Sequence, residues 1–149
     1  MPQIEREYIA TGKIKYVVLD FPLESIHPNA FKAAEAAHCA GEQGKFWEMH
    51  VRLFANQRAL APSDLPLHAQ AIGVEMLPFA QCLDSGKYAP RVRKDLAEGQ
   101  QAGVTGTPGF FFGVTDPNEP KVKVLKVIKG ALPYLSFKEA IESLLSSHR

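Results

Sequence analysis

Residues 103–113 read Gly-Val-Thr-Gly-Thr-Pro-Gly-Phe-Phe-Phe-Gly, a glycine-rich turn that places a proline just before three phenylalanines. Proline has no backbone N–H to give to a sheet ladder, so Pro108 is expected at the mouth or the edge of a strand. The apolar run Phe110–Phe112 is the expected strand. A cis bond between Thr107 and Pro108 would be a fixed feature of such a turn, because cis bonds are uncommon even before proline.

The residues after this proline predict a β-hairpin and then one helix. Two strand-like runs, Phe110–Phe112 and Val122–Lys129, flank a turn-rich connector at Thr115–Pro120. Ser136 and Glu139 form a capping-box pattern and are expected to open the last helix. Lysines recur along the second run, as in an edge strand protected against pairing with other chains, at Lys121, Lys123, Lys126 and Lys129.

The residues before the turn predict a short helix, one strand and a long helical region. Pro2–Thr11 is expected to be helical, with Gly12 in the C-terminal capping position. Lys13–Asp20 is expected to be a strand covered on both faces, because its run from Tyr16 to Leu19 is apolar throughout. Five helical segments should follow, at Asn29–Ala40, Lys45–Gln57, Ser63–Ile72, Glu75–Asp84 and Lys87–Ala102.

The spacing of side chains also predicts which faces of these helices are buried. Ser63 is expected to cap the third segment, and Trp47 is expected to pack in the core with Phe46. In the last segment Asp95 and its charged neighbours are expected to stay in water, while Tyr88 and Val92 turn inward with Leu96. In the second segment an inward stripe at helical spacing comprises Phe46, His50, Leu53 and Phe54.

Several segments, taken in order, resemble the DsbA-like branch of the thioredoxin superfamily. They are Phe21-Pro22-Leu23, Ile26-His27-Pro28, residues 33–37, residues 43–47 and residues 104–108. The resemblance implies an α/β, thioredoxin-like fold with a mixed sheet, a single incomplete domain at residues 1–149, and a helical insertion at residues 29–102. Its members are envelope thiol–disulfide oxidoreductases, so unfolded or cysteine-containing polypeptides are the implied partners and the periplasm or cell envelope the implied location.

The 149 residues contain no Cys-x-x-Cys motif, which in this family opens the first long helix. The chain is therefore expected to be truncated, with the N-terminal strand and the first half of the active-site helix missing. That strand would lie between Lys13–Asp20 and Phe110–Phe112, and each buried backbone group left unpaired costs about 1–3 kcal/mol. Three arrangements would fill the gap: the remaining strands close up against each other, a homodimer completes the sheet, or an upstream segment occupies the position. An in-frame Cys-x-x-Cys before the Met1 codon would establish truncation.

The two cysteines, Cys39 and Cys82, stand at a spacing that matches no zinc or redox motif. Three states remain open for them: buried reduced side chains, a structural disulfide, or a reactive thiol. A disulfide that closes so long a loop would contribute about 4 kcal/mol in the chain-entropy model, and only in an oxidising compartment. Neither cysteine is expected at a helix N-terminus, where the helix dipole would favour a thiolate.

Composition argues against several classes of function. The net charge is +1 with acidic and basic residues interleaved, so no field favours nucleic acid or an anionic membrane. No apolar run approaches the roughly 18 residues of a membrane span. The amino terminus is charged and is no signal peptide, so the chain as written would stay in the cytoplasm. No cofactor and no metal is expected, because no ligand spacing joins the histidines His27, His38, His50, His68 and His148.

The sequence thus predicts a DsbA-like protein that has no catalytic residue in this chain and is redox-inactive alone. By resemblance, Thr107 and Pro108 would hold an extended peptide by strand addition; otherwise the turn only positions the Phe110 strand. The alternative function is a non-catalytic peptide-binding or interaction domain that keeps the cis-proline groove, and the third is a thiol enzyme that uses Cys39. Asp20, at the end of its strand, is expected to face solvent, and the alternative for it is a buried acid that assists proton transfer. His50 and His68 are expected to be hydrogen-bonded in the core.

Overall fold

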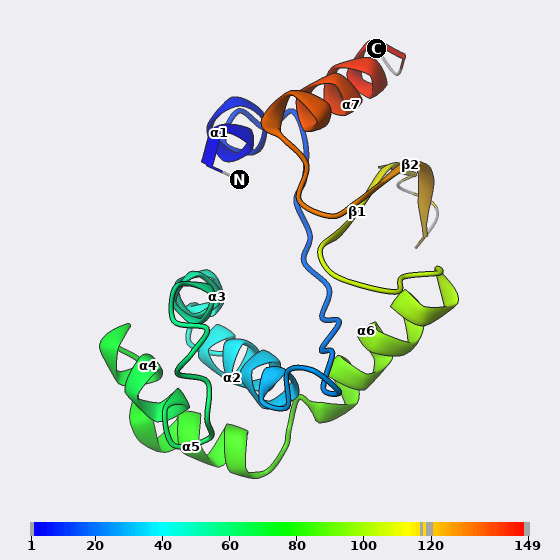
Figure 1. Cartoon of the computed structure of the whole chain (residues 1–149). Helices are drawn as coiled ribbons and strands as arrows, with labels where there is room; N and C mark the ends of the chain where they lie inside the picture. The colour runs from blue at the N-terminus through cyan, green and yellow to red at the C-terminus, as the bar shows by residue number, and fades with distance from the viewer. Residues whose placement is uncertain (1, 117, 119–120, 148–149) are drawn as a thin grey trace. The chain divides into compact units, whose positions relative to one another are not determined.

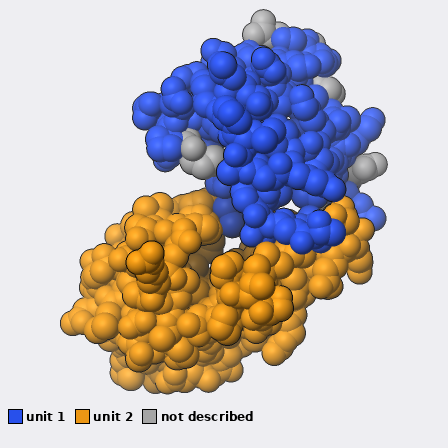
Figure 2. All heavy atoms as spheres, in the orientation of Figure 1, with its two compact units in different colours: residues 1–18, 104–149 blue, residues 19–103 orange. Residues whose placement is uncertain are grey.

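The computed structural model of the chain describes residues 2–116, 118 and 121–147, and it divides into two compact units. Unit 1 comprises residues 1–18 and 104–149, and unit 2 comprises residues 19–103 (Figure 2). Across the described residues there are seven α-helices and one two-stranded antiparallel sheet (Figure 1). The expected α/β fold class is therefore confirmed.

Unit 1 packs its terminal helices against a β-hairpin. The ring of Phe137 on the last helix contacts the rings of Phe110 and Phe112, with centroids 4.7 and 6.3 Å apart. Its elements are α1 (Pro2–Ile4), the π-helix η1 (Glu5–Ile9), β1 (Gly109–Thr115), β2 (Val122–Lys129) and α7 (Tyr134–Ser147). Its buried core comprises Ile4, Tyr8, Ile128, Phe137, Ala140 and Ile141.

The predicted hairpin is confirmed. Strand β1 runs antiparallel to β2, with Phe110 opposite Ile128 and Phe111 opposite Val127. A bulge follows Phe112, and a side chain at Gly113 would collide with the backbone of Lys123, so glycine is required there. Within the predicted connector, residues 117, 119 and 120 lie outside the described part of the chain.

A buried tyrosine joins the N-terminal helix to α7. The Tyr8 hydroxyl donates to a carboxylate oxygen of Glu142 at 2.7 Å, and the Tyr134 hydroxyl donates to Glu7. The hydrogen bond to Glu142 and the burial of the ring together raise the pKa of Tyr8 far above its ordinary value. Two phenol–carboxylate pairs thus hold the first turns of the chain on α7, the two elements that lie side by side in Figure 1.

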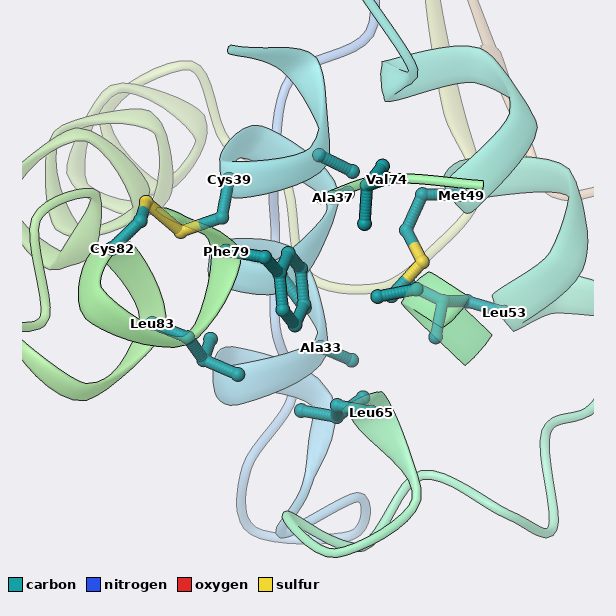
Figure 3. Close-up of a cluster of buried hydrophobic side chains, with 13 residues drawn as sticks. Ala33, Ala37, Cys39, Met49, Leu53, Leu65, Val74, Phe79, Cys82 and Leu83 are labelled. Atoms are coloured by element: carbon teal, nitrogen blue, oxygen red, sulfur yellow. A yellow bond between two sulfur atoms is a disulfide. The ribbon is translucent and has the colours of Figure 1, made fainter. Parts of the chain in front are cut away.

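Unit 2 contains five helices, and the first four of them build one buried apolar cluster. Small residues on α2 allow its neighbours to approach closely, and Phe79 lies in the middle of the cluster (Figure 3). The helices are α2 (Ala30–Gly41), α3 (Phe46–Ala55), α4 (Leu65–Ala71), α5 (Met76–Asp84) and α6 (Ala89–Gln101). The largest wholly buried side chains of the cluster are Met49, Leu65, Phe79 and Cys39.

The strand expected at Lys13–Asp20 is wrong. This segment has no strand partner among the described residues, and β1 pairs with β2 alone. Two of its apolar side chains, Val17 and Leu19, are 61% and 58% exposed rather than covered. A strand exists only where another backbone completes its ladder, so an apolar run was insufficient evidence. The expected mixed sheet is accordingly reduced to an antiparallel hairpin.

Three local predictions within the helices are also wrong. Phe54 is 64% exposed, because the buried stripe of α3 runs through Met49 and Leu53 instead. Trp47 lies on the exposed side of the same helix. Ser63 caps nothing, since α4 begins two residues later, at Leu65.

The capping-box prediction for the last helix is wrong as well. Helix α7 already begins at Tyr134, so Ser136 lies inside its first turn instead of preceding it. The backbone N–H of Ser136 donates to the carbonyl of Pro133 at 3.1 Å. Proline fits the start of a helix because it lacks an N–H that would be unpaired there. Pro133 therefore favours a helix that begins at Tyr134, before Ser136.

Candidate functional site: the Thr107–Pro108 loop and its surroundings

The loop before β1 is an exposed stretch of backbone within unit 1. The peptide bond between Thr107 and Pro108 is cis, and β1 begins at the next residue, Gly109. The carbonyl of Pro108 accepts the N–H of Gly130 at 2.8 Å, which attaches the loop to the end of β2. Among the described residues, no hydrogen bond uses the backbone N–H or carbonyl of Thr107. Both groups are available to an incoming chain.

An apolar pocket of about 330 Å³ also lies within unit 1. It includes Phe110, which is two residues beyond Pro108 on β1. A pocket of this kind can hold an apolar side chain. Its lining comprises Pro2, Gln3, Ile4, Phe110, Ala131, Leu132, Tyr134 and Phe137.

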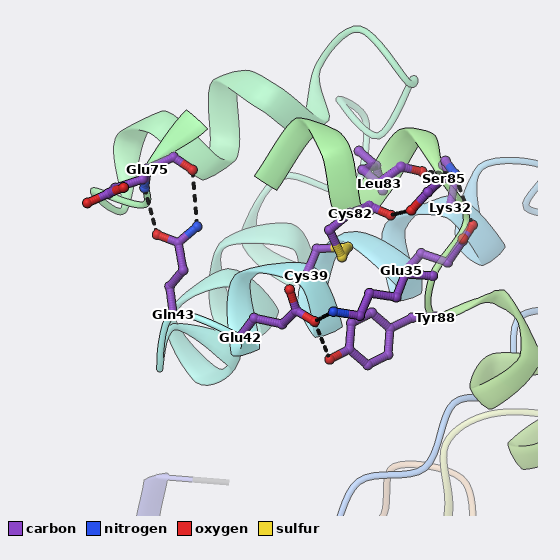
Figure 4. The surroundings of a disulfide bond; sticks show 11 residues. Lys32, Glu35, Cys39, Glu42, Gln43, Glu75, Cys82, Leu83, Ser85 and Tyr88 are labelled. Carbon is purple, nitrogen blue, oxygen red and sulfur yellow. Dashed lines mark hydrogen bonds and ion pairs between the residues drawn. A yellow bond between two sulfur atoms is a disulfide. The ribbon is translucent and has the colours of Figure 1, made fainter. Parts of the chain in front are cut away.

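Cys39 and Cys82 form a disulfide in unit 2, so among the three states left open the structure shows the bridge (Figure 4). The bond joins α2 to α5 across a sequence separation of 43 residues. The two cysteines are only 1% and 5% exposed. Disulfide exchange requires a thiolate to reach one of the sulfurs, and both sulfurs lie on residues that are almost wholly buried.

Polar side chains surround the disulfide (Figure 4). Glu42 accepts from both Lys87 and the Tyr88 hydroxyl, and the hydrogen bond from Lys87 is the main reason that the pKa of Glu42 lies below its ordinary value. Lys32 donates to the carbonyl of Leu83 at 2.6 Å and pairs with the buried Glu35 at 3.3 Å. These contacts tie α2 to α5 and α6 around the bridge.

The sequence did not predict the polar network centred on Asp20. Its Oδ2 atom lies 2.6 Å from Nε2 of His38, whose ring packs between those of Phe46 and Tyr88 at 5.3 and 5.2 Å. The backbone N–H of Asp20 donates to Oδ2 of Asp95 at 3.1 Å. The expectations that Asp20 faces solvent and that Asp95 stays in water are both wrong. Nothing local in the sequence pairs three residues so far apart.

Two of the other histidines, His50 and His68, contact neighbouring side chains or backbone in unit 2. His68 is buried, accepts from Nε of Arg52 at 3.1 Å and donates to the carbonyl of Ala59 at 2.7 Å, which confirms it as a hydrogen-bonded core histidine. His50 is half-buried between the rings of Phe46 and Phe54, without the predicted hydrogen bond, and burial lowers its pKa. His27 is exposed, and His148 lies outside the described residues.

Neither a metal-binding cluster nor a membrane-spanning helix occurs among the described residues. No group of three or more histidine, cysteine, aspartate or glutamate side chains is placed to hold a metal ion. None of the described helices has both the length and the apolar character needed to cross a membrane.

The fold and the loop together define the class of protein. An α/β chain that has a cis-proline turn leading into a strand of a hairpin, and a separate set of helices, is of thioredoxin-like type. The family model described as thioredoxin matches residues 1–126. The chain therefore belongs to the thioredoxin family.

Similar proteins carry two kinds of name. A Na(+)/H(+) antiporter NhaA 3 of Salinispora tropica is 37% identical over 110 residues, which are 74% of this chain and 17% of the antiporter. A Na(+)/H(+) antiporter NhaA 1 of Salinispora arenicola is 42% identical over 98 residues, 66% of this chain and 15% of that protein. A Rickettsia prowazekii protein named as a protein-disulfide oxidoreductase is 28% identical over 138 residues, 88% of this chain and 50% of that protein. The chain thus spans about a sixth of each antiporter and half of the third relative.

Proposed function

We propose that this chain is a thioredoxin-family domain that binds extended polypeptides at Thr107–Pro108 and performs no dithiol–disulfide exchange by itself. The observation that carries the proposal is the state of its cysteines: the sequence has two, and both are held in one buried disulfide. In this proposal the chain is one thioredoxin-like domain whose helical insertion is residues 29–102.

Thiol chemistry needs groups that these residues do not supply. The attacking cysteine must be accessible and must exist as a thiolate, which a helix N-terminus or a nearby cation favours. Cys39 lies in the last turn of α2, where the helix dipole opposes a negative charge, and it is wholly buried. This position argues against the thiol enzyme based on Cys39 and in favour of a structural role for the bridge.

Peptide binding follows from the backbone of the loop. Strand addition requires an accessible N–H and carbonyl that are not already paired, and Thr107 offers both. The carbonyl of Pro108 accepts the N–H of Gly130, and this hydrogen bond attaches the loop to the residue after β2. The partners we propose are unfolded or cysteine-containing polypeptides, by analogy with the relative named as a protein-disulfide oxidoreductase. The likeness to antiporters covers too little of those proteins to suggest ion transport.

We further propose an oxidising location, the periplasm or the cell envelope. Disulfides persist there and are rare in a reducing cytosol, so the bridge between Cys39 and Cys82 supports this placement. The proposal also includes association of two copies to complete the sheet, because within the described residues β1 pairs with β2 alone.

Insulin reduction by the purified 149-residue chain tests the redox part of the proposal. The expected rate equals that of buffer with reductant alone, and the Cys39→Ser/Cys82→Ser variant should match it. A rate of insulin reduction clearly above that of buffer, and absent in this variant, would show dithiol turnover and contradict the proposal.

Backbone amide NMR during titration with a reduced, alkylated insulin B chain tests peptide binding. The amide signals of Thr107 and Gly109 should shift or broaden, whereas signals from α4 should stay in place. Shifts confined to residues outside the loop, or no shifts at all, would contradict binding at this position.

A further inference from the structure

A buried histidine in unit 2 connects α3 and α4 through its two ring nitrogens. Nδ1 of His68 accepts from Nε of Arg52 on α3 at 3.1 Å, and Nε2 donates to the carbonyl of Ala59 at 2.7 Å. A guanidinium can only donate and a carbonyl can only accept, so these partners allow one protonation state of the ring. Only the neutral imidazole with its hydrogen on Nε2 satisfies both contacts.

The same contacts hold the connector at residues 56–64, which joins α3 to α4. The N–H of Ala59 donates to the carbonyl of Asn56 at 2.9 Å, and the side-chain amide of Asn56 donates to the carbonyl of Arg52 at 2.8 Å. His68 is only 5% exposed, so protein groups satisfy its ring nitrogens. The ring thus links α4 to the last turn of α3 and to the connector.

A second proton on the ring of His68 would break one of the two contacts. The proton would bind to Nδ1 and turn this nitrogen from an acceptor into a donor that faces the N–H of Arg52. It would also place a positive charge next to the guanidinium, which is always protonated in proteins. The bond to Ala59 suits both states of the ring, because Nε2 carries a hydrogen in each. Acid therefore breaks the contact with Arg52.

The charges around His68 do not offset a protonated ring. No carboxylate among the described residues forms an ion pair with His68 or Arg52. Asp64, one turn earlier, accepts from the N–H of Ala61 at 3.1 Å, and Arg58 in the connector is a further cation. Helices α2, α3 and α5 pack against α4, and their other titratable side chains are Lys32, Glu35, His38, Glu48, His50 and Asp84. Arg52 is thus the charged group that contacts the ring.

We propose that His68 and Arg52 form an acid-operated latch between α3 and α4, closed when the ring is neutral and open when it is protonated. A histidine in water gains its proton near pH 6.5, as the open form does. The closed form excludes this proton, so the latch is stable above that pH and opens as the pH falls through it. The ratio of open to closed latch should rise about tenfold from about pH 7.5 to about pH 5.5. Opening frees the half-buried Arg52 and removes this link between α3 and α4.

NMR of side-chain nitrogens tests the latch in the parent chain. At about pH 7.5 the ring of His68 should carry its hydrogen on Nε2 and none on Nδ1. As the pH falls, the Nε–H signal of Arg52 should shift on the same curve as the ring signals. Its protection from hydrogen exchange, corrected for the intrinsic effect of pH, should fall about tenfold. A hydrogen on Nδ1 at neutral pH, or an Arg52 signal that does not move over this range, would overturn the proposal.

Matched variants separate the charge of Arg52 from its hydrogen bond. Arg52→Gln keeps an N–H at the position of Nε without the positive charge, and its amide can turn an oxygen toward a protonated ring. Between about pH 7.5 and about pH 5.5, the equilibrium constant of unfolding in urea should rise more in the parent than in this variant, by up to about tenfold. Arg58→Gln removes an equal charge from an exposed position of the connector and should keep the parent's pH dependence. Equal pH dependence in the two variants would contradict the latch.

Discussion

Oδ2 of Asp20 lies 2.6 Å from Nε2 of His38, and both side chains are largely withdrawn from water in unit 2. The backbone N–H of the same aspartate donates to Asp95, so residue 20 is held by α2 and α6 at once. Hydrogen bonds that involve side chains thus hold the first residues of unit 2 against α2 and α6. The sequence alone indicates a strand in this segment.

A double-mutant cycle should show that Asp20 and His38 are coupled. Asp20→Ala or His38→Leu should each lower the free energy of unfolding by about 1–3 kcal/mol, because each leaves a buried polar group without its partner. The double variant should lose less than the sum of the two by about 0.5 kcal/mol or more. Urea denaturation measures all three values. The exposed Asp84→Ala should change stability by less than about 0.5 kcal/mol, and strictly additive single effects would argue against the pair.

Removal of the disulfide should destabilise the chain. The bridge closes a loop of 43 residues, and the chain-entropy model then assigns it about 4 kcal/mol. Cys39→Ala/Cys82→Ala should therefore lower the free energy of unfolding by about 2–4 kcal/mol, measured by urea denaturation without reductant. The parent chain treated with reductant should fall to a similar value. Alkylation of the unreduced, denatured parent followed by intact-mass measurement should add nothing, and an adduct would reveal free thiols.

The half-buried His50 should make the chain less stable in acid. Burial lowers its pKa in the folded state, against a weaker opposing effect of Asp20, so the unfolded chain binds more protons below the ordinary histidine pKa. Stability from this residue is present above that pKa and is lost as the pH falls toward the folded value. Urea denaturation at about pH 7.5 and about pH 5.5 should show a smaller acid loss in His50→Phe than in the parent. An equal loss in both would contradict this assignment.

Predictions from the sequence succeeded where the pattern is local. The helices and the hairpin follow from apolar spacing and from turn residues, and each begins within a few residues of its predicted position. The prediction of a strand at Lys13–Asp20 was wrong because a strand needs a second strand to pair with, and the sequence of the segment does not show whether one is present. The exposure of Phe54 was missed because α3 carries apolar residues on more than one side, and only packing decides which side is buried.

In the candidate site too, local sequence patterns predicted some features, and others depend on how distant segments pack. The resemblance of residues 104–108 to a cis-proline loop identified the position of Thr107 and Pro108, and the structure has that bond in the cis form. The contact of Asp20 with His38 and Asp95 joins three distant segments, so it follows from how the helices pack and not from spacing along the chain. The bridge between Cys39 and Cys82 was one of three open states, because sequence shows the number of cysteines but not the distance between them.

Gly99, in the last turn of α6, shows how close packing can outweigh helix propensity. Replacing an exposed helical glycine with alanine stabilises a helix by about 1 kcal/mol. A Cβ at Gly99 would lie 2.6 and 2.8 Å from two ring carbons of Phe21, well inside contact distance. Gly99→Ala should therefore lower the free energy of unfolding by about 1–3 kcal/mol, because the ring must move.

Two further variants separate propensity from collision at this helix. Ala97→Gly, at an exposed position of α6, measures the propensity alone and should cost about 1 kcal/mol. Phe21→Ala removes the ring, so adding Gly99→Ala to it should cause no further loss and should recover some of the propensity gain. If Gly99→Ala instead stabilises the parent by as much as Ala97→Gly destabilises it, Phe21 does not pack against Gly99, and residue 21 is not held on α6 in the way its neighbour Asp20 is held by Asp95.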